Sequence, residues 1–159
     1  MGNAEGGDDV GDVDGLRGEW QTFELFGTEP NSICVGCGLC CDGTLLTHLA
    51  VSDESDLGAP LRMLGVEIIA AAEPPVFELP CPAVENGTCT IHHLHRPRAC
   101  AQFECALSQA VLDRNVEPED AREVIDMTLN VRFDVRSGRA PQSDLDHLLD
   151  RHFRGTISK

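Results

Sequence analysis

Four of the eight cysteines lie within the short segment SICVGCGLCCDG. The pattern C-x2-C-x2-C-C places thiols at Cys34, Cys37, Cys40 and Cys41. A spacing of two residues lets successive thiolates converge on one metal while amides of the loop point at the sulfurs, and Gly36 and Gly38 permit the tight turns. Bacterial ferredoxin loops hold three corners of a four-iron cluster in this way, whereas structural zinc sites usually draw two ligands from each of two separated segments. The run therefore predicts a metal centre and favours iron over zinc.

The other four thiols lie further along the chain, at Cys81, Cys89, Cys100 and Cys105. Ferredoxin-like runs carry a Cys-Pro step, and Cys81 with Pro82 offers one from a distance. We therefore expect a cluster, such as a four-iron cluster, to be held by Cys34, Cys37, Cys40 and Cys81. Cys41 cannot easily join Cys40 on one ion because chelation by adjacent residues strains the intervening peptide. It is expected to ligate a second metal, to face a second iron or to stay free.

All eight cysteines are thus candidate metal ligands, and counting alone leaves three arrangements open. These are two four-thiolate sites, one iron–sulfur cluster with a zinc site, or one cluster with spare cysteines. Disulfide bonding is disfavoured because a cytosolic chain is kept reduced. In addition, a C-x2-C-x2-C-C run does not resemble a disulfide framework, in which the bridges join cysteines far apart in the chain. A thioredoxin-like redox motif is disfavoured because these cysteines do not follow a strand within a βαβ pattern.

Histidines and arginines near the cysteines are secondary candidates. His92, His93 and His95 follow Cys89, and imidazole is a common zinc ligand, although solvated loop histidines are the expected role. His48 is expected to be an ordinary half-buried histidine in preference to a hydrogen-bonding partner of a sulfur.

Arg96 and Arg98 flank Pro97 in an otherwise acidic protein. A cation near a thiolate-rich centre lowers its net charge and raises the potential of a cluster. The alternative, that Arg96 pairs with a carboxylate, is compatible with this role.

The elements around the cysteines are expected to be short. The alternation in 44–51 predicts a strand with Leu45, Leu49 and Val51 on one face, and Ser52 is the expected cap of a following helix. Residues 76–79 form an extended piece between prolines. Residues 81–92 predict a hairpin with Cys81 and Cys89 on its arms, because Asn-Gly at 86–87 suits a two-residue turn.

The second half of the chain is expected to be mainly helical. A helix ends within 106–115, and Pro118 begins another whose apolar stripe faces the core. The stripe consists of Ala121, Val124, Ile125, Thr128 and Leu129. Alternation in 131–136 predicts a strand that ends at Ser137 and Gly138. Ser143 is the expected cap of a final helix with Leu145, Leu148, Leu149 and Phe153 inward.

Charge and glycine content divide the chain into two regions. Residues 1–30 hold eight of the 27 acidic residues, seven of the 15 glycines and one basic residue, so we expect a mostly disordered acidic tail. The first bulky apolar side chains of the tail are Trp20, Phe23 and Phe26. We expect them to dock on the domain, and the alternative is that they contact a partner. Residues 31–159 are expected to form a single α+β domain. Its halves are an irregular cysteine-cluster part, 31–105, and a helical and strand support, 106–159.

The cysteine pattern resembles the YkgJ-type cysteine-cluster family, whose members carry zinc- or iron-chelating CxxCxxCC domains. The resemblance covers residues 34–105 and includes all eight cysteines, with Pro82 after Cys81, Thr90-Ile91 after Cys89, and Arg96-Pro97 before Cys100. His92 stands where the family usually has tyrosine, and the stretch from Cys89 to Arg96 is one residue longer. The resemblance implies metal binding and does not define a reaction.

We therefore expect a metal-binding protein with an iron–sulfur cluster, serving redox or electron-transfer chemistry or an enzyme assembled with a protein partner. The alternative is a zinc-binding structural or adaptor module without catalysis. Whether the chain is an enzyme stays open. The net charge of −15 disfavours nucleic-acid partners and anionic membranes. No apolar run is long enough to cross a bilayer, and the N-terminus lacks a signal-peptide pattern, so we expect a cytoplasmic protein.

Overall fold

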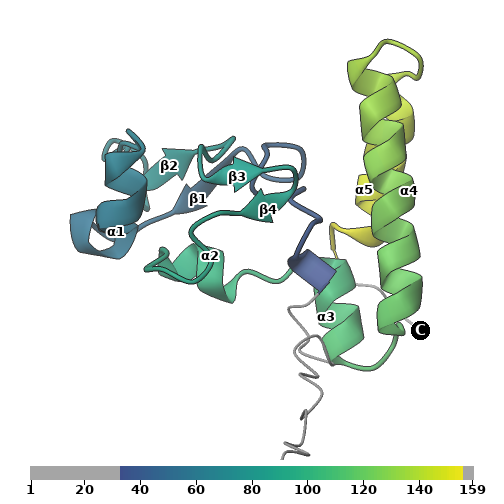
Figure 1. Ribbon diagram of the computed structural model, residues 1–159, viewed down its shortest axis with the longest axis horizontal. Helices are drawn as coiled ribbons and strands as arrows, with labels where there is room; N and C mark the ends of the chain where they lie inside the picture. Colours follow the sequence, from purple (N-terminus) through teal and green to yellow (C-terminus); the bar gives the residue numbers. More distant parts are fainter. Residues whose placement is uncertain (1–32, 156–159) are drawn as a thin grey trace, which may run out of the picture.

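A computed structural model describes residues 33–155 (Figure 1). The predictions for the acidic tail, 1–30, and its aromatic residues lie outside this described part. The described elements, in chain order, are β1 His48–Ala50, α1 Glu54–Met63, β2 Val76–Glu78, β3 Val84–Glu85, β4 Thr88–Cys89, α2 Arg98–Gln102, α3 Ala106–Leu112, α4 Pro118–Arg136 and α5 Gln142–His152. This mixture of helices with small antiparallel sheets confirms the α+β class.

The strands form two small sheets on the same side of the molecule. β1 pairs antiparallel with β2 and sets Leu49 opposite Phe77, while β3 and β4 form the hairpin. In that hairpin Asn86 and Gly87 have φ values of 50° and 76°, which confirms the predicted turn. The apolar faces of β1, β2 and α1 meet in one core, which contains Leu49, Val51, Leu57, Leu61, Phe77, Ala83 and Ile91. We call this the sheet core.

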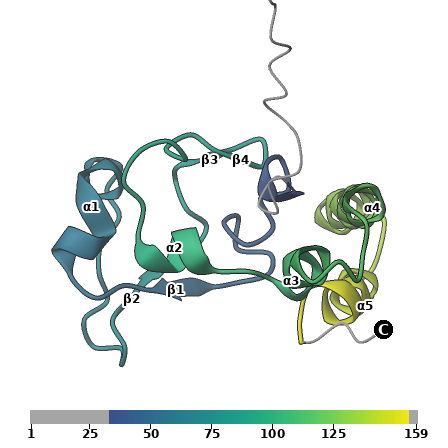
Figure 2. The same ribbon diagram turned by 90° about the horizontal axis from the view of Figure 1, so that it is seen from below.

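The three C-terminal helices form a second core with the start of the described chain. α4 and α5 run side by side, and α3 lies against them, away from the strands (Figures 1 and 2). The buried members of this core, the helix core, are Ile33, Leu39, Leu107, Ala121, Ile125, Leu145, Leu149 and Phe153. The buried residues at 121, 125 and 128 confirm the central part of the apolar stripe expected on the helix from Pro118.

One prediction for the C-terminal half is wrong, because residues 131–136 are helical. α4 continues without a break to Arg136, and Ser137 follows it as the C-cap. Val131 and Val135 are four residues apart and pack against the helix core from one side of α4. An alternation of apolar and polar residues over only six positions fits either a strand or one stripe of a helix. Packing of this segment against the helix core therefore decided in favour of the helix.

Two further expectations need correction. The strand expected over 44–51 is confined to β1, and Leu45 packs against the helix core whereas Leu49 and Val51 lie in the sheet core. The expected helix caps are also displaced. Asp53, not Ser52, caps α1 by accepting the backbone N–H groups of Ser55 and Asp56, and α5 begins at Gln142 after Pro141.

Candidate metal centre

The cysteine loop, residues 34–41, is a series of tight turns fixed by one buried side chain. The Cys37 N–H donates to the Cys34 carbonyl at 3.2 Å, and the Cys41 N–H donates to the Gly38 carbonyl at 3.0 Å. Gly36 and Gly38 have φ values of 83° and 65°, so the expectation that they permit turns is confirmed. Leu39, which is fully buried, attaches this loop to the helix core.

The β3–β4 hairpin turn lies directly against the cysteine loop. A Cβ placed on Gly87 would lie 2.5 Å from the Gly36 carbonyl oxygen, and one placed on Gly38 would lie 2.6 Å from the Gly87 Cα. Glycine at both positions is therefore required for the two backbones to approach this closely. The contact brings the loop next to the strand that ends at Cys89.

Replacing Gly87 with alanine should destabilise the protein and separate the hairpin from the loop. Alanine meets a positive φ and a backbone clash at Gly87, whereas at Gly65, where φ is 81°, it meets no atom within 4 Å. We expect Gly65→Ala to lower the free energy of unfolding by about 1 kcal/mol, the cost of the left-handed conformation, and Gly87→Ala to lower it by at least twice as much. Urea unfolding of both variants measures the difference. Equal losses would show that the close approach contributes nothing.

Three cysteines of the loop and Cys105 form one neighbourhood, which we call the first group. Cys37 and Cys105 both pack against the helix core. Burial, followed by the nearby Cys105 and Cys37 thiols, raises the pKa of Cys40. Cys34 reaches solvent, yet burial of its sulfur and then Cys105 raise its pKa to about 11. The first group is therefore Cys34, Cys37, Cys40 and Cys105.

The remaining thiols form a second group around the sheet core. Cys81, Cys89 and Cys100 pack against this core. The Cys81 N–H donates to the Cys41 carbonyl at 2.8 Å, which joins Cys41 to them. Burial and then Cys41 and Cys81 raise the pKa of Cys100 to about 12. The second group is therefore Cys41, Cys81, Cys89 and Cys100, and the peptide bond between Cys40 and Cys41 links the two groups.

Backbone amides face several sulfurs. The amide of Leu39 hydrogen-bonds to the Cys37 sulfur, and that of Ala83 to the Cys81 sulfur, in each case two residues on. These hydrogen bonds lower the pKa of the two thiols, although burial has the larger effect and raises it. Amides aimed at sulfur stabilise thiolate charge, as in metal–thiolate loops.

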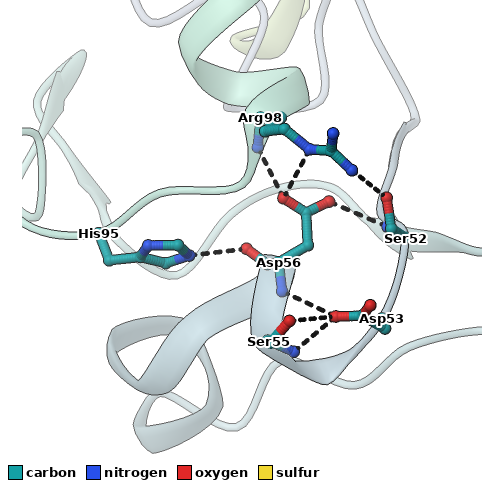
Figure 3. Close-up of polar contacts among 6 residues, drawn as sticks. All are labelled: Ser52, Asp53, Ser55, Asp56, His95 and Arg98. Carbon is teal, nitrogen blue, oxygen red and sulfur yellow. Dashed lines mark hydrogen bonds and ion pairs between the residues drawn. The ribbon is translucent and has the colours of Figure 1, made fainter.

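A polar network positions α2 and therefore Cys100 (Figure 3). The Asp56 carboxylate accepts the backbone N–H of Arg98 at 3.0 Å and that of Ser52 at 2.9 Å. The Arg98 guanidinium donates to the Ser52 hydroxyl at 2.7 Å, and the His95 ring lies 2.9 Å from the Asp56 carbonyl. These contacts fasten the first turn of α2 to the start of α1.

The histidines and arginines that the sequence offered as secondary candidates are not members of either thiol group. His95 belongs to the α2 network. The expectation that His48 is half-buried is wrong, because its side chain is exposed on the short strand β1 and hydrogen-bonds to Thr47 at 2.9 Å. Arg96 lies near the second group, where its charge lowers the pKa of Cys41 and Cys100. His92 and His93 are exposed.

The donor chemistry suits a metal, but the thiols are not drawn together as ligands. All eight cysteines are free, and each group offers four sulfur donors. Among residues 33–155, no three His, Cys, Asp or Glu side chains lie close enough to hold one metal ion. Cys81 lies beside Cys41 and Cys89, whereas sequence reasoning assigned it to the cluster held by the loop. Metal binding by either group therefore requires the four sulfurs to move closer together.

Sequence reasoning missed two polar neighbours of the first group. The buried Ser108 hydroxyl donates to the Glu104 carboxylate, and both residues act on Cys34, whose pKa the carboxylate raises and the hydroxyl lowers. Arg132 on α4 pairs with Asp42, which follows the loop. Arg132 and Arg136 are four residues apart, so on a helix both lie on one face and can reach the same carboxylate. The prediction of a strand over these residues hid this signal.

The metal-free protein should lose stability as pH rises from 9 to 11. Seven thiols have a pKa raised above the ordinary value of about 9, so the folded chain keeps protons that the unfolded chain releases in this range. Because the unfolded state then binds fewer protons, the free energy of unfolding falls with pH. The chain has no tyrosine and Lys159 as its one lysine, so few other groups titrate there. A urea midpoint of the reduced protein that stays constant from pH 8 to 10.5 would refute this expectation.

Comparison of the chain with protein-family models, curated proteins and solved structures gave no match. None of the helices within residues 33–155 has the length and apolar character needed to span a membrane.

Proposed function

We propose that this protein binds metal at two separate four-thiolate sites, one in each thiol group. The observation that carries the proposal is the division of five cysteines between two cores, because Cys37 and Cys105 pack on the helix core while Cys81, Cys89 and Cys100 pack on the sheet core. The adjacent pair Cys40–Cys41 fits this division, since adjacent residues serve different metals without strain in the peptide. The amides that face the sulfurs support thiolate ligation.

We assign an iron–sulfur cluster to the first group, with Cys34, Cys37, Cys40 and Cys105 as its ligands. Three thiols from one compact loop and a fourth from a distant segment follow the ligation pattern of ferredoxin-type loops. Such a cluster supplies one-electron redox chemistry. The protein would then serve electron transfer, or an enzyme complex with a protein partner, in the cytoplasm. The cysteine pattern shared with the YkgJ-type family supports metal binding and leaves the reaction open.

A zinc-binding structural or adaptor module is the second candidate, and the second group favours it. Its thiols come from four separated segments, the loop, the residues before β3, β4 and α2, so this group lacks the compact three-thiolate loop that favours an iron–sulfur cluster in the first group. Zinc at this site would hold the hairpin and α2 together, and its binding energy would add to folding.

Anaerobic purification followed by metal analysis and an absorption spectrum tests the proposal. We expect iron with acid-labile sulfide and a broad visible absorption, with or without one zinc ion per chain. A colourless protein with two zinc ions per chain would overturn the iron–sulfur assignment and support the zinc module. A protein that takes up neither metal after anaerobic reconstitution would overturn metal binding itself.

A further inference from the structure

A pocket of about 310 Å³ lies where the end of β1, the residues before β2 and the start of α2 meet. It has apolar walls and one polar side, and its lining residues are Ala50, Val51, Ser52, Asp56, Pro74, Pro75, Arg98, Ala99 and Gln102. We call it the Arg98 pocket. Its volume is at the lower end of the range for small-molecule sites. Its lining residues include no cysteine of either thiol group, so the pocket is separate from the candidate metal centre.

The polar side of this pocket carries a guanidinium whose orientation is fixed. Nη2 of Arg98 donates to the Ser52 hydroxyl at 2.7 Å, and Nε lies 3.7 Å from Oδ1 of Asp56. The remaining nitrogen, Nη1, points away from both residues, as Figure 3 shows, and the Arg98 side chain is 71% exposed. A guanidinium held in this way is pre-organised to donate to the two oxygens of a carboxylate.

The carboxylate of Asp56 does not occupy the donors of this guanidinium. Its two oxygens accept backbone N–H groups instead, Oδ1 that of Arg98 at 3.0 Å and Oδ2 that of Ser52 at 2.9 Å. A separation of 3.7 Å between Nε and Oδ1 is too long for a hydrogen bond. The Asp56 side chain is only 9% exposed, so this carboxylate fastens α2 from within the protein. The exposed part of the Arg98 guanidinium keeps its donors for a ligand.

The apolar walls and the charge of the chain define the rest of the ligand. Val51, Pro74 and Pro75 offer apolar surface beside the guanidinium, which suits a short hydrocarbon chain. The net charge of −15 repels a polyanion such as a nucleotide more strongly than a single carboxylate. We propose that the Arg98 pocket binds a small-molecule monocarboxylate, with its carboxylate on the Arg98 guanidinium and its apolar chain along the two prolines. This inference goes beyond metal binding and does not depend on it.

Titration of the full-length protein, purified anaerobically, with three small molecules tests this inference. Binding is followed by NMR through the amide chemical shifts of Ala99 and Gln102, which line the pocket. Pentanoate should bind with a dissociation constant in the millimolar range. Pentanamide has the same shape without the charge and should bind about tenfold more weakly or worse, because it loses the charge-assisted hydrogen bonds. Acetate keeps the charge but lacks the apolar chain, so it should also bind about tenfold more weakly.

Substitutions locate the binding site. Arg98→Gln should weaken pentanoate binding about tenfold or more. Ala50→Leu fills the pocket without removing the guanidinium and should weaken binding about fivefold. Arg62→Gln is the matched control, because it removes a half-exposed guanidinium that pairs with Glu54 on α1 and does not line the pocket. It should leave pentanoate binding unchanged. Urea unfolding of each variant checks that it is folded.

The inference is supported if pentanoate binds more tightly than both pentanamide and acetate, and if Arg98→Gln and Ala50→Leu weaken it while Arg62→Gln does not. It is overturned if the amides of Ala99 and Gln102 show no saturable shift, or if pentanoate and pentanamide bind equally. Equal losses in Arg98→Gln and Arg62→Gln would also overturn it, since they would indicate a general effect of charge. If Arg98→Gln does not fold, Ala50→Leu decides, because undiminished binding by that variant excludes the pocket.

Discussion

Replacing Cys40 with serine should remove the metal of the first group and leave that of the second, and Cys100→Ser should do the reverse. Cys40 lies near Cys34, Cys37 and Cys105 as well as its chain neighbour Cys41, whereas Cys100 lies near Cys41, Cys81 and Cys89. Serine has nearly the size of cysteine but does not supply a thiolate, so a four-thiolate site loses one ligand and most of its affinity. Metal content per chain, determined after anaerobic reconstitution, should fall by one site in each variant.

The double variant gives the corresponding control. Cys40→Ser with Cys100→Ser should bind neither metal, because each group then has three thiols. Loss of all metal in the single Cys40→Ser variant would instead indicate one shared centre. Full retention in that variant would show that Cys40 is not a ligand.

Leu39→Ala should cost about 2–5 kcal/mol in the free energy of unfolding of the metal-free protein. Leu39 is fully buried in the helix core, and it lies between two thiols of the first group. Alanine would leave a cavity at this point and release the loop from its one deeply buried anchor. The same change should therefore weaken metal binding by the first group, because the thiols lose their common support.

Val35→Ala is the matched control for Leu39→Ala. It shortens an aliphatic side chain in the same loop, but Val35 is 59% exposed. We expect a change within about 0.5 kcal/mol. Urea unfolding of the reduced proteins measures both effects. Equal destabilisation by the two variants would contradict the role of Leu39 as the anchor.

The sequence predicted the local features of the fold better than their assembly. The hairpin at Asn86-Gly87, the extended piece at Phe77 and the helix from Pro118 were correct, because turn residues, prolines and apolar periodicity are local signals. The division of Leu45 and Leu49 between two cores was not predictable in this way, since alternation does not reveal where a chain leaves one core for another.

The same limit applies to the candidate site. Spacing identified the loop and made all eight cysteines candidates, but it did not show which thiols lie together. The approach of Cys105 to the loop depends on α3 packing against α4, and the approach of Cys81 to Cys41 depends on a backbone hydrogen bond between distant segments. Arg132 was missed for the related reason that a short alternating stretch fits a helix as well as a strand.

X-ray absorption at the metal edge tests the central claim, two four-thiolate sites, most directly. The protein is purified anaerobically, and spectra are recorded for the wild type and for Cys40→Ser and Cys100→Ser. We predict that each metal in the wild type has a first shell made only of sulfur, and that each single variant keeps one such centre. A first shell with nitrogen or oxygen ligands in the wild type, or the loss of all metal in either single variant, would contradict the account.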